Sequence, residues 1–409
     1  MSLLLDQTVE KSVDHQDPQS QYGRGLVPDS SRASRPRSFA VADFPVPTGR
    51  EEEWRFTPVD RLGNVLSNEP SDDRDGDVAV DYDVQHADQA GVSIATLAPG
   101  QAPRGTALIP EDRGAAVASE QTGDALHLSI AANAELAEPV RLNVHGNGAG
   151  RRSNAHYVLQ AGANSRGMVI VNHTGSSDHT GNLEAIVGDG AHLTVVTLQQ
   201  WENDAIHLGQ HEAKVGRDAT YKHIAITLGG GIVRMNSNVS YDSSGGEATL
   251  LGVYFADAGQ HLEHRSFVDH NVPNSTSLVT YKGALQGDTA HTVWVGDVLI
   301  RKEASDIETY ELNRNLILTD GARADSVPNL EIETGEIKGA GHASSTGRFD
   351  DEQLFYLMSR GMDEKNARRL VVRGFFADII AKIGVPEVQE ALMEAIDDEL
   401  TLTMGTSAA

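Results

Sequence analysis

Short apolar runs recur along the middle of the chain at a nearly constant spacing. Each follows a turn rich in Gly and Asp and a small residue, and is rich in Val, Ile, Thr and Leu. The intervals between successive small positions are 29, 28, 28, 29, 28 and 28. A fixed period of about 20–50 residues is typical of proteins built from stacked repeats. The small residues are Ala134, Ala163, Ala191, Ala219, Ala248, Thr276 and Ala304.

Three architectures have units of about this length: the βα unit, the leucine-rich repeat and the coil of a β-solenoid. No amphipathic helix fits between successive apolar runs, and the leucine spacing that marks leucine-rich repeats is absent. The repeat therefore predicts a parallel β-helix, in which each coil pairs its backbone with its neighbours and points alternate side chains inward. The 40 glycines fit the many sharp corners that such a fold requires.

Changes in composition divide the chain into four parts. Residues 1–36 lack apolar periodicity and predict a disordered arm. Residues 37–123 predict a helical or irregular region, and the β-helix is expected over residues 124–346. Residues 347–409 change to a helical pattern and predict a C-terminal helical domain.

Three helices are expected in this last part. The first begins with capping-box spacing between Asp350 and Gln353. Asp363 is placed to cap the second, which continues to Ile383. Pro386 then begins a third, acidic helix.

Charge and cysteine content exclude several classes of function. The 33 basic and 59 acidic residues give a net charge of −26, which disfavours nucleic acid or an anionic membrane as the main partner. With no cysteine, the chain cannot supply thiolate ligands, disulfides or a thiol nucleophile, so a metal would need some of its 16 histidines, its carboxylates or a partner's thiolates. The N-terminus lacks the basic region of a secretory signal, and no apolar run is long enough to span a membrane, so a cytoplasmic location is expected.

The second C-terminal helix has an unusually broad apolar face. Two interpretations stay open: the face packs on the other helices, or part of it docks another protein with arginines at the rim. One column of the face holds Val371, Phe375, Ile379 and Ile383, the next holds Val372, Phe376 and Ile380, and the rim holds Arg368, Arg369 and Arg373.

Three segments resemble the SufB/SufD family, the scaffold subunits of the SUF iron–sulfur cluster assembly machine. The most specific is EIKGAGHASSTGRFDDEQLFYLMSRGMDEKNARRLVVRGFFADII at 336–380, which is similar to the family's C-terminal region. EEEWRFT at 51–57 resembles an element near the family's N-terminus, and HRSFVDHNVPNSTS at 264–277 resembles its late core. The resemblance covers most of the chain beyond residue 36 and implies a right-handed parallel β-helix between helical ends.

Within this family the chain resembles the SufD type, because SufB is associated with cysteines used to carry sulfur and build the cluster. His342 matches the family's functional histidine, with Gly347 and Arg348 aligned. Many relatives carry a cysteine just before this histidine, where Gly341 stands here, and Ala343 replaces the glycine that follows. The resemblance implies that His342 is an imidazole ligand for iron at a subunit interface, beside thiolates of the partner.

The resemblance also implies a complex with one SufB-type paralogue and two copies of a SufC-type ABC ATPase. The β-helix cores of the paralogues would pair, and the C-terminal helices would bind the ATPase. Because the chain has no GxxxxGK[ST] phosphate loop, we expect a non-catalytic scaffold that binds no cofactor alone and holds iron or an iron–sulfur cluster transiently in the complex. The expected ATPase-binding residues are Phe355, Arg360, Arg369, Arg373, Phe375, Phe376 and Ile379.

Two other functions stay open. The chain could act as a SufB-like scaffold in a homodimer, although the lack of cysteine disfavours it. A β-helix carbohydrate-active enzyme is a more distant alternative, disfavoured by the missing export signal and the helical C-terminus.

Five further histidines are expected to have structural or surface roles. His261, His264 and His270 lack the two-residue spacing that would put neighbours on one face of a strand. His223 and His291 lie in runs typical of strands and are expected to be inward or surface positions rather than metal ligands.

Overall fold

The structure is a computed structural model that describes residues 34–74, 76–349 and 351–406. The chain divides into two units, Met1–Arg35 and Pro36–Ala409, and the architecture below is that of the second unit. The disordered arm predicted for residues 1–36 therefore lies almost entirely outside the described residues.

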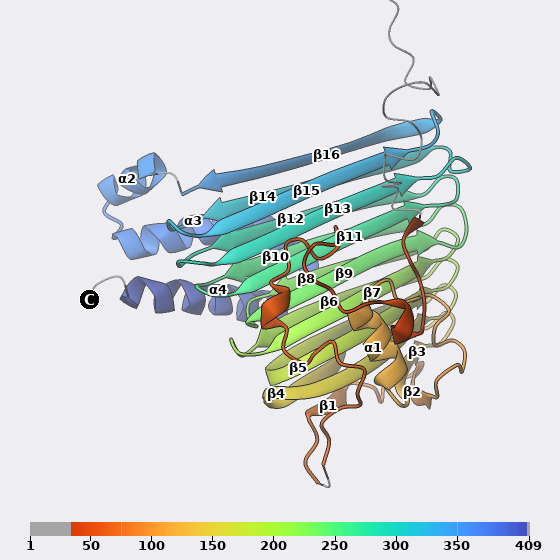
Figure 1. Cartoon of the computed structure of the whole chain (residues 1–409). Coiled ribbons are helices and arrows are strands. Elements are labelled where there is room, and N and C mark those ends of the chain that lie inside the picture. Colours follow the sequence, from red (N-terminus) through yellow and green to blue (C-terminus); the bar gives the residue numbers. More distant parts are fainter. Residues whose placement is uncertain (1–33, 75, 350, 407–409) are drawn as a thin grey trace, which may run out of the picture. The chain divides into compact units, whose positions relative to one another are not determined.

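Parallel strands wind into a β-helix of about eight turns (Figure 1), as the repeat predicts. Strands β4 (Val140–Ala161) and β5 (Arg166–Val187) span both sides of their coils, and later coils carry one strand on each side. The even side stacks β6 (His192–Trp201), β8 (Thr220–Thr227), β10 (Glu247–Ala256), β12 (Thr276–Leu285), β14 (Ile307–Ile317) and β16 (Ile337–Arg348). The odd side stacks β7 (Ile206–Val215), β9 (Ile232–Tyr241), β11 (His261–His270), β13 (His291–Ile300) and β15 (Arg323–Ile332).

The length of a coil varies more than the sequence repeat suggests. The pairing of His192 with Thr220 spans one sequence repeat, whereas the pairing of Thr276 with Glu308 spans a distinctly longer coil. The late coils are longer because the turns between their strands are longer. Ala304, expected to mark the last repeat, therefore lies before β14 and out of register with Thr276.

Alternate side chains of the two sides meet in one continuous core inside the solenoid. Most are aliphatic, such as Leu250, Val279 and Val298, but Tyr254 and Trp294 are fully buried there as well. Because each coil adds one layer to this core, burial of apolar area and the backbone ladder between coils stabilise the same stack.

Two strands and a helix occupy residues 37–123, where a helical or irregular region is predicted. Strand β1 (Val80–Gln85) runs antiparallel to the first part of β4, and β2 (Val92–Leu97) runs antiparallel to β3 (Ala125–Ile130). The prediction missed both strands because each has only six residues and is largely exposed. Helix α1 (Arg113–Gln121) packs against β5 and β7.

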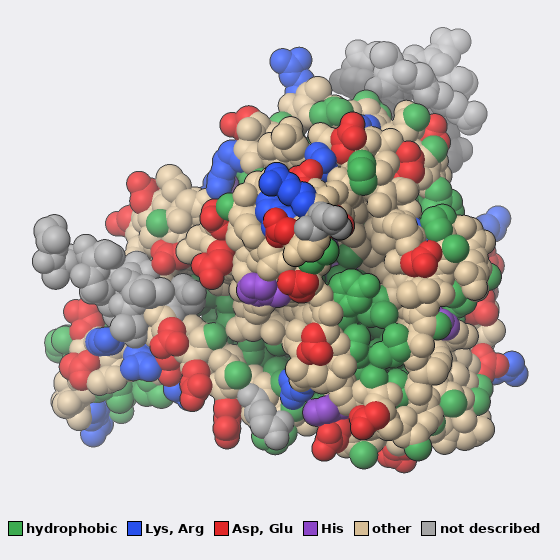
Figure 2. All heavy atoms as spheres, turned by 90° about the horizontal axis from the view of Figure 1, so that it is seen from below, with side chains coloured by type: hydrophobic (Ala, Val, Ile, Leu, Met, Phe, Trp, Pro, Cys, Tyr) green, Lys and Arg blue, Asp and Glu red, His purple; other side chains and the backbone are tan. Residues whose placement is uncertain are grey.

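Strands β1 to β3 cover the edges of the first coil, so that β4 has neighbours on both sides. In the view from this end, Figure 2 shows hydrophobic side chains gathered in a hollow, with acidic side chains scattered around them.

The segment EEEWRFT packs on the odd side, next to the short 3₁₀ helix Val59–Arg61. The guanidinium of Arg234 lies 4.1 Å from the centre of the Trp54 ring. Thr57 donates a hydrogen bond of 2.7 Å from Oγ1 to Oε2 of the buried Glu263. These contacts hold the N-terminal region on the outer face of the solenoid.

Three α-helices follow the last strand: α2 (Asp351–Ser359), α3 (Glu364–Ile380) and α4 (Pro386–Thr406). Asp363 caps α3 as expected, because its side chain accepts a hydrogen bond from the backbone N–H of Asn366. A 3₁₀ turn follows α3, and Gly384 then takes a left-handed conformation. None of the helices within the described residues is long and apolar enough to cross a membrane.

Candidate functional site

His342 lies on β16, the terminal strand of the even side. It is exposed, and it stands in register with Glu311 of β14. Four polar residues of β14 are buried and alternate with neighbours that are exposed or partly exposed: Thr309, Glu311, Asn313 and Asn315.

The side chain of His342 is one of the β16 side chains that point toward the interior of the solenoid. Asn315 faces the interior and donates a hydrogen bond of 3.3 Å from Nδ2 to Oγ1 of Thr346, its register partner. Because side chains alternate along a strand, residues 346, 344 and 342 share this orientation. His342 is therefore presented at the open end of the solenoid, above the interior.

The backbone of β16 has one free side. The N–H of Phe349 donates to the carbonyl of Ile317 on β14. Because N–H groups alternate in direction along a strand, the N–H of Ser345, four residues earlier, also points toward β14. The N–H groups of His342 and Ser344 then point away. No strand of the described part of the chain pairs with that side. The strand that carries His342 is thus an edge with unused hydrogen-bonding groups.

Glu311 is an unusual neighbour for an exposed histidine. It is 1% exposed, and neither carboxyl oxygen has a hydrogen-bond partner among the described residues. Burial raises the pKa of Glu311 to about 9, and the nearby Asp297 carboxylate adds to the rise. The carboxyl group is therefore protonated at neutral pH. Nothing in the sequence marked this residue beyond its place in a polar strand.

We expect the substitution Glu311→Gln to make the protein more stable relative to wild type as the pH rises. In the unfolded chain Glu311 loses its proton near its ordinary pKa of 4.5, whereas in the folded chain it keeps the proton up to about pH 9. As the pH rises from about 4.5 to about 9, the free energy of unfolding of the wild-type protein therefore decreases, and the variant does not show this decrease. The difference in unfolding free energy should grow by on the order of 3 kcal/mol between about pH 5 and pH 8.

Denaturant unfolding at several pH values measures this difference. Glu308→Gln, at an exposed position on the same strand, is the matched control. A pH-independent difference for Glu311→Gln would mean that Glu311 is ionised in the folded protein.

A second candidate surface lies on α2 and the start of α3. Phe355 is 74% exposed, Tyr356 57% and Leu370 49%. The guanidinium of Arg360 lies 5.2 Å from the centre of the Tyr356 ring. Exposed apolar side chains gathered beside an arginine are typical of a protein-binding surface.

The other arginines expected at this surface make ion pairs within the chain. Arg369 and Arg373 both bind Oδ2 of Asp397 on α4, at 2.8 and 2.6 Å. Phe375 is half-buried, and its ring lies 5.1 Å from the ammonium group of Lys282 on β12.

Phe376 and Ile379, expected to contact a partner, are 0% exposed. They belong to a cluster formed by α3, α4 and the outer face of the even side. Their side chains are therefore part of the chain's own core, which corrects the expectation that they are available for docking. The strands on this side carry apolar residues on both faces. Those on the outer face pack in the same cluster as α3: Ile170, Val196, Ile224, Leu251 and Val253.

The five histidines expected to be structural are largely enclosed in the fold. His223, His261, His264 and His270 are buried, while His291 is partly exposed and lies 2.7 Å from Oδ2 of Asp325 through Nε2. The described residues contain one group of three side chains placed to share a metal ion, and it is a different one: His173, His179 and His207.

Sequence reasoning missed this group, although a signal was present. His179 and His207 are separated by one full repeat, and they pair in register on β5 and β7. Aligning the histidines on the repeat would have put these two side by side. His173 could not be found in this way, because it reaches the pair from the other side of the coil.

Comparison with known proteins gives a consistent result. Residues 144–375 match the family model described as SUF system FeS cluster assembly, SufBD core domain. An iron–sulfur cluster assembly SufBD family protein of Mycobacterium bovis is 49% identical over 375 residues, covering 90% of this chain and 93% of that protein. One of Mycobacterium leprae is 49% identical over 380 residues, covering 91% and 95%. One of Synechocystis is 25% identical over 213 residues, covering 52% and 47%.

Proposed function

The chain belongs to the SufBD family of iron–sulfur cluster assembly proteins, and from this premise we propose that it is a non-catalytic scaffold subunit of the SufD type. In this proposal it pairs with a SufB-type paralogue and binds a SufC-type ATPase. The absence of cysteine supports the SufD type, because the thiolates of a growing cluster must then come from the partner.

One observation carries the proposal: His342 is exposed on a strand whose outer side pairs with no strand of residues 34–74, 76–349 and 351–406. Pairing of this edge with the edge of a paralogous β-helix buries the free backbone groups and brings His342 to the seam. The neutral imidazole then serves as one ligand of iron or of a nascent cluster, beside thiolates of the paralogue. The cluster is the cargo of the complex rather than a resident cofactor of this chain.

Co-expression with a SufB-type paralogue and a SufC-type ATPase tests this function. We expect the tagged chain to purify anaerobically with both proteins, and the complex to show the visible absorption and acid-labile sulfide of an iron–sulfur cluster. A cluster on the chain alone as a homodimer would support the SufB-like alternative. Failure to purify with either protein would contradict the proposal.

The exposed surface of α2 is the proposed site for the ATPase. Phe355 and Arg360 are free to contact a partner, whereas Phe376 and Ile379 support α3 from below. The proposed contact area is therefore narrower than the sequence suggested, and Arg369 and Arg373 contribute by fixing α3 on α4.

We expect Phe355→Asp to abolish ATPase binding without lowering stability, because it puts a charge into a contact that is apolar in the complex and exposed in the free chain. Phe376→Ala is the matched comparison: it should lower the free energy of unfolding by about 3–5 kcal/mol, since it empties a fully buried site. Pull-down and denaturant unfolding of both variants measure the two effects. Normal ATPase binding by Phe355→Asp would remove α2 from the interface.

A further inference from the structure

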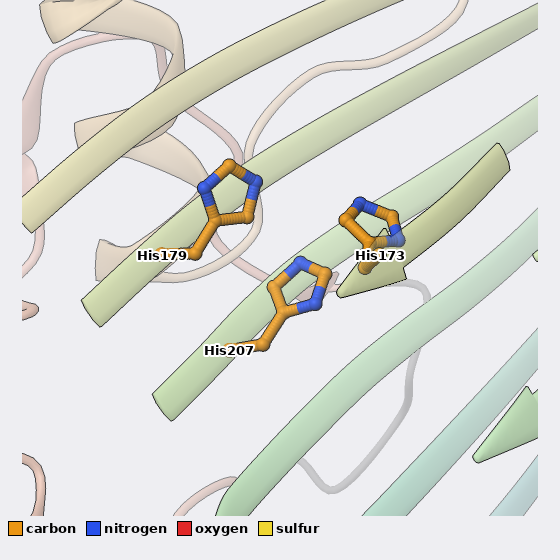
Figure 3. A group of neighbouring side chains, drawn as sticks. All are labelled: His173, His179 and His207. Carbon is orange, nitrogen blue, oxygen red and sulfur yellow. The ribbon is translucent and has the colours of Figure 1, made fainter. Parts of the chain in front are cut away.

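Three buried imidazoles meet inside the early coils of the solenoid, far along the sequence from His342. His173 and His179 lie on β5, on either side of Gly175, whose positive φ of 72° lets the strand turn the corner. His207 lies on β7, in register with His179. One nitrogen from each ring lies within 4.8 Å of the others, and Figure 3 shows the three rings around a common space.

Hydrogen bonds fix the tautomer of His179. Ser177 Oγ donates its only proton to the carbonyl oxygen of Arg151 at 2.7 Å. In its contact with Ser153 Oγ, 2.8 Å away, Ser177 Oγ is therefore the acceptor and Ser153 Oγ the donor. The proton of Ser153 is thereby used, and Ser153 Oγ must accept from Nδ1 of His179 at 2.7 Å. Nδ1 of His179 therefore carries the proton, and Nε2 keeps its lone pair.

The other two rings also contact the fold through Nδ1. Nδ1 of His173 lies 3.3 Å from the carbonyl oxygen of Leu198, which can only accept. His173 thus donates through Nδ1 and keeps a lone pair on Nε2. Nδ1 of His207 lies 2.8 Å from Oε1 of Gln199 and 3.1 Å from Nε1 of Trp201, so the fold contacts this ring through Nδ1 and leaves Nε2 to face the other two rings.

The Nε2 atoms of His179 and His207 are buried without a hydrogen-bond partner among the described residues. Burial lowers the pKa of His173 to about 4, and burial together with neighbouring histidines keeps the pKa of His179 and His207 well below the ordinary value. Buried ring nitrogens without a hydrogen-bond partner are costly, and a cation placed between them removes that cost.

We propose that His173, His179 and His207 form a binding site for one first-row divalent metal ion, Zn²⁺ or Fe²⁺, through their Nε2 atoms. Imidazole nitrogen is a preferred ligand of both ions, and three histidines with an open fourth position form a known type of zinc site. The contacts of the three Nδ1 atoms with Leu198, Ser153 and Gln199 match the outer contacts that orient metal-binding histidines. This site does not depend on the proposed role of His342.

Gly181 leaves the room that the ion needs. A Cβ at this position would lie 2.9 Å from Nε2 of His179 and 3.2 Å from Nε2 of His207. The missing side chain therefore opens space next to two of the three nitrogens. Metal–nitrogen bonds of about 2.0–2.1 Å place ligand nitrogens roughly 3.4 Å apart, so binding requires the rings to move inward by about 1 Å.

Metal titration of the full-length, metal-free chain tests the site. The probes are Zn²⁺ in air and Fe²⁺ under anaerobic conditions, with bound metal measured by elemental analysis after gel filtration. We expect one ion per chain from at least one probe, together with a higher melting temperature. Trp201 gives a local signal, because its ring centre lies 5.3 Å from that of His173 and 5.6 Å from those of His179 and His207, and its fluorescence should fall when Fe²⁺ binds.

Two variants separate this site from adventitious binding at surface histidines. Gly181→Ala keeps all three ligands but fills the space, and His207→Phe removes one ligand; each should weaken binding by about a hundredfold or more. His264→Phe changes a buried histidine of a later coil and should leave binding unchanged. Circular dichroism of the metal-free variants reports whether each folds. No stoichiometric binding of either ion, or binding unchanged in both site variants, would overturn the proposal.

Discussion

A complex that contains the His342→Ala chain should assemble normally but lose its iron–sulfur cluster, with acid-labile sulfide falling at least tenfold. Assembly is unaffected because His342 is exposed and the backbone of β16 keeps its pairing with β14. The cluster is lost because the chain has no cysteine to replace a missing imidazole at the seam. Visible absorption and sulfide analysis of the anaerobically reconstituted complex measure the effect.

Two comparisons make this result specific. His86→Ala changes another exposed histidine, on a turn outside the β-helix, and should leave the cluster intact. His342→Cys should restore much of the cluster, because a thiolate is a good ligand for the same iron. A normal cluster content in the His342→Ala complex would show that His342 is not a ligand.

Proline at Ser344 should separate this chain from its paralogue, while proline at Ser345 should instead damage the fold. The N–H of Ser344 points to the free side of β16, and that of Ser345 points to β14. Proline removes one N–H, so Ser344→Pro deletes a hydrogen bond of the proposed seam and places a ring there. We expect association to weaken by roughly 2–3 kcal/mol, or on the order of a hundredfold in Kd.

Analytical ultracentrifugation of the paralogue pair measures association, and thermal unfolding of the free chain measures damage to the fold. Ser344→Ala and Ser345→Ala are the controls, since they change the side chain and keep the N–H. If Ser344→Pro binds the paralogue with wild-type affinity, β16 is not the pairing edge, and the role of His342 at a seam loses its support.

The sequence was informative where structure depends on local chemistry. Asp363 marked the start of α3, because the cap of a helix is a local requirement, and the expected end at Ile383 is the end of the 3₁₀ turn that follows α3. The nearly constant period of the apolar runs predicted the solenoid, because each coil must return the chain to the same register.

What depends on packing between distant segments was harder to predict. The apolar face of α3 had two open interpretations, and Phe376 and Ile379 were assigned to a partner. The structure shows them against the outer face of the even side. That face could have been recognised from even-side runs such as VVTL, which are apolar at consecutive positions and so must be covered on both faces.

The candidate sites show the same division. His342 was found by its place in a specific motif, but its orientation above the buried Glu311 follows from the register of β14 and β16. His173 joins His179 and His207 only because β5 turns a corner at Gly175. A corner of this kind has no spacing rule, so the sequence could not predict the third histidine.

The two ends of the stack are unequal, and this limits how far such a protein can polymerise. A solenoid with two parallel open edges could add copies indefinitely and grow into a fibre. Here the first coil ends in antiparallel β1, whose edge carries Asp81 and Asp83. Short strands and edge carboxylates disfavour growth at this terminus, and pairing of two molecules through β16 covers the long parallel edge at the other.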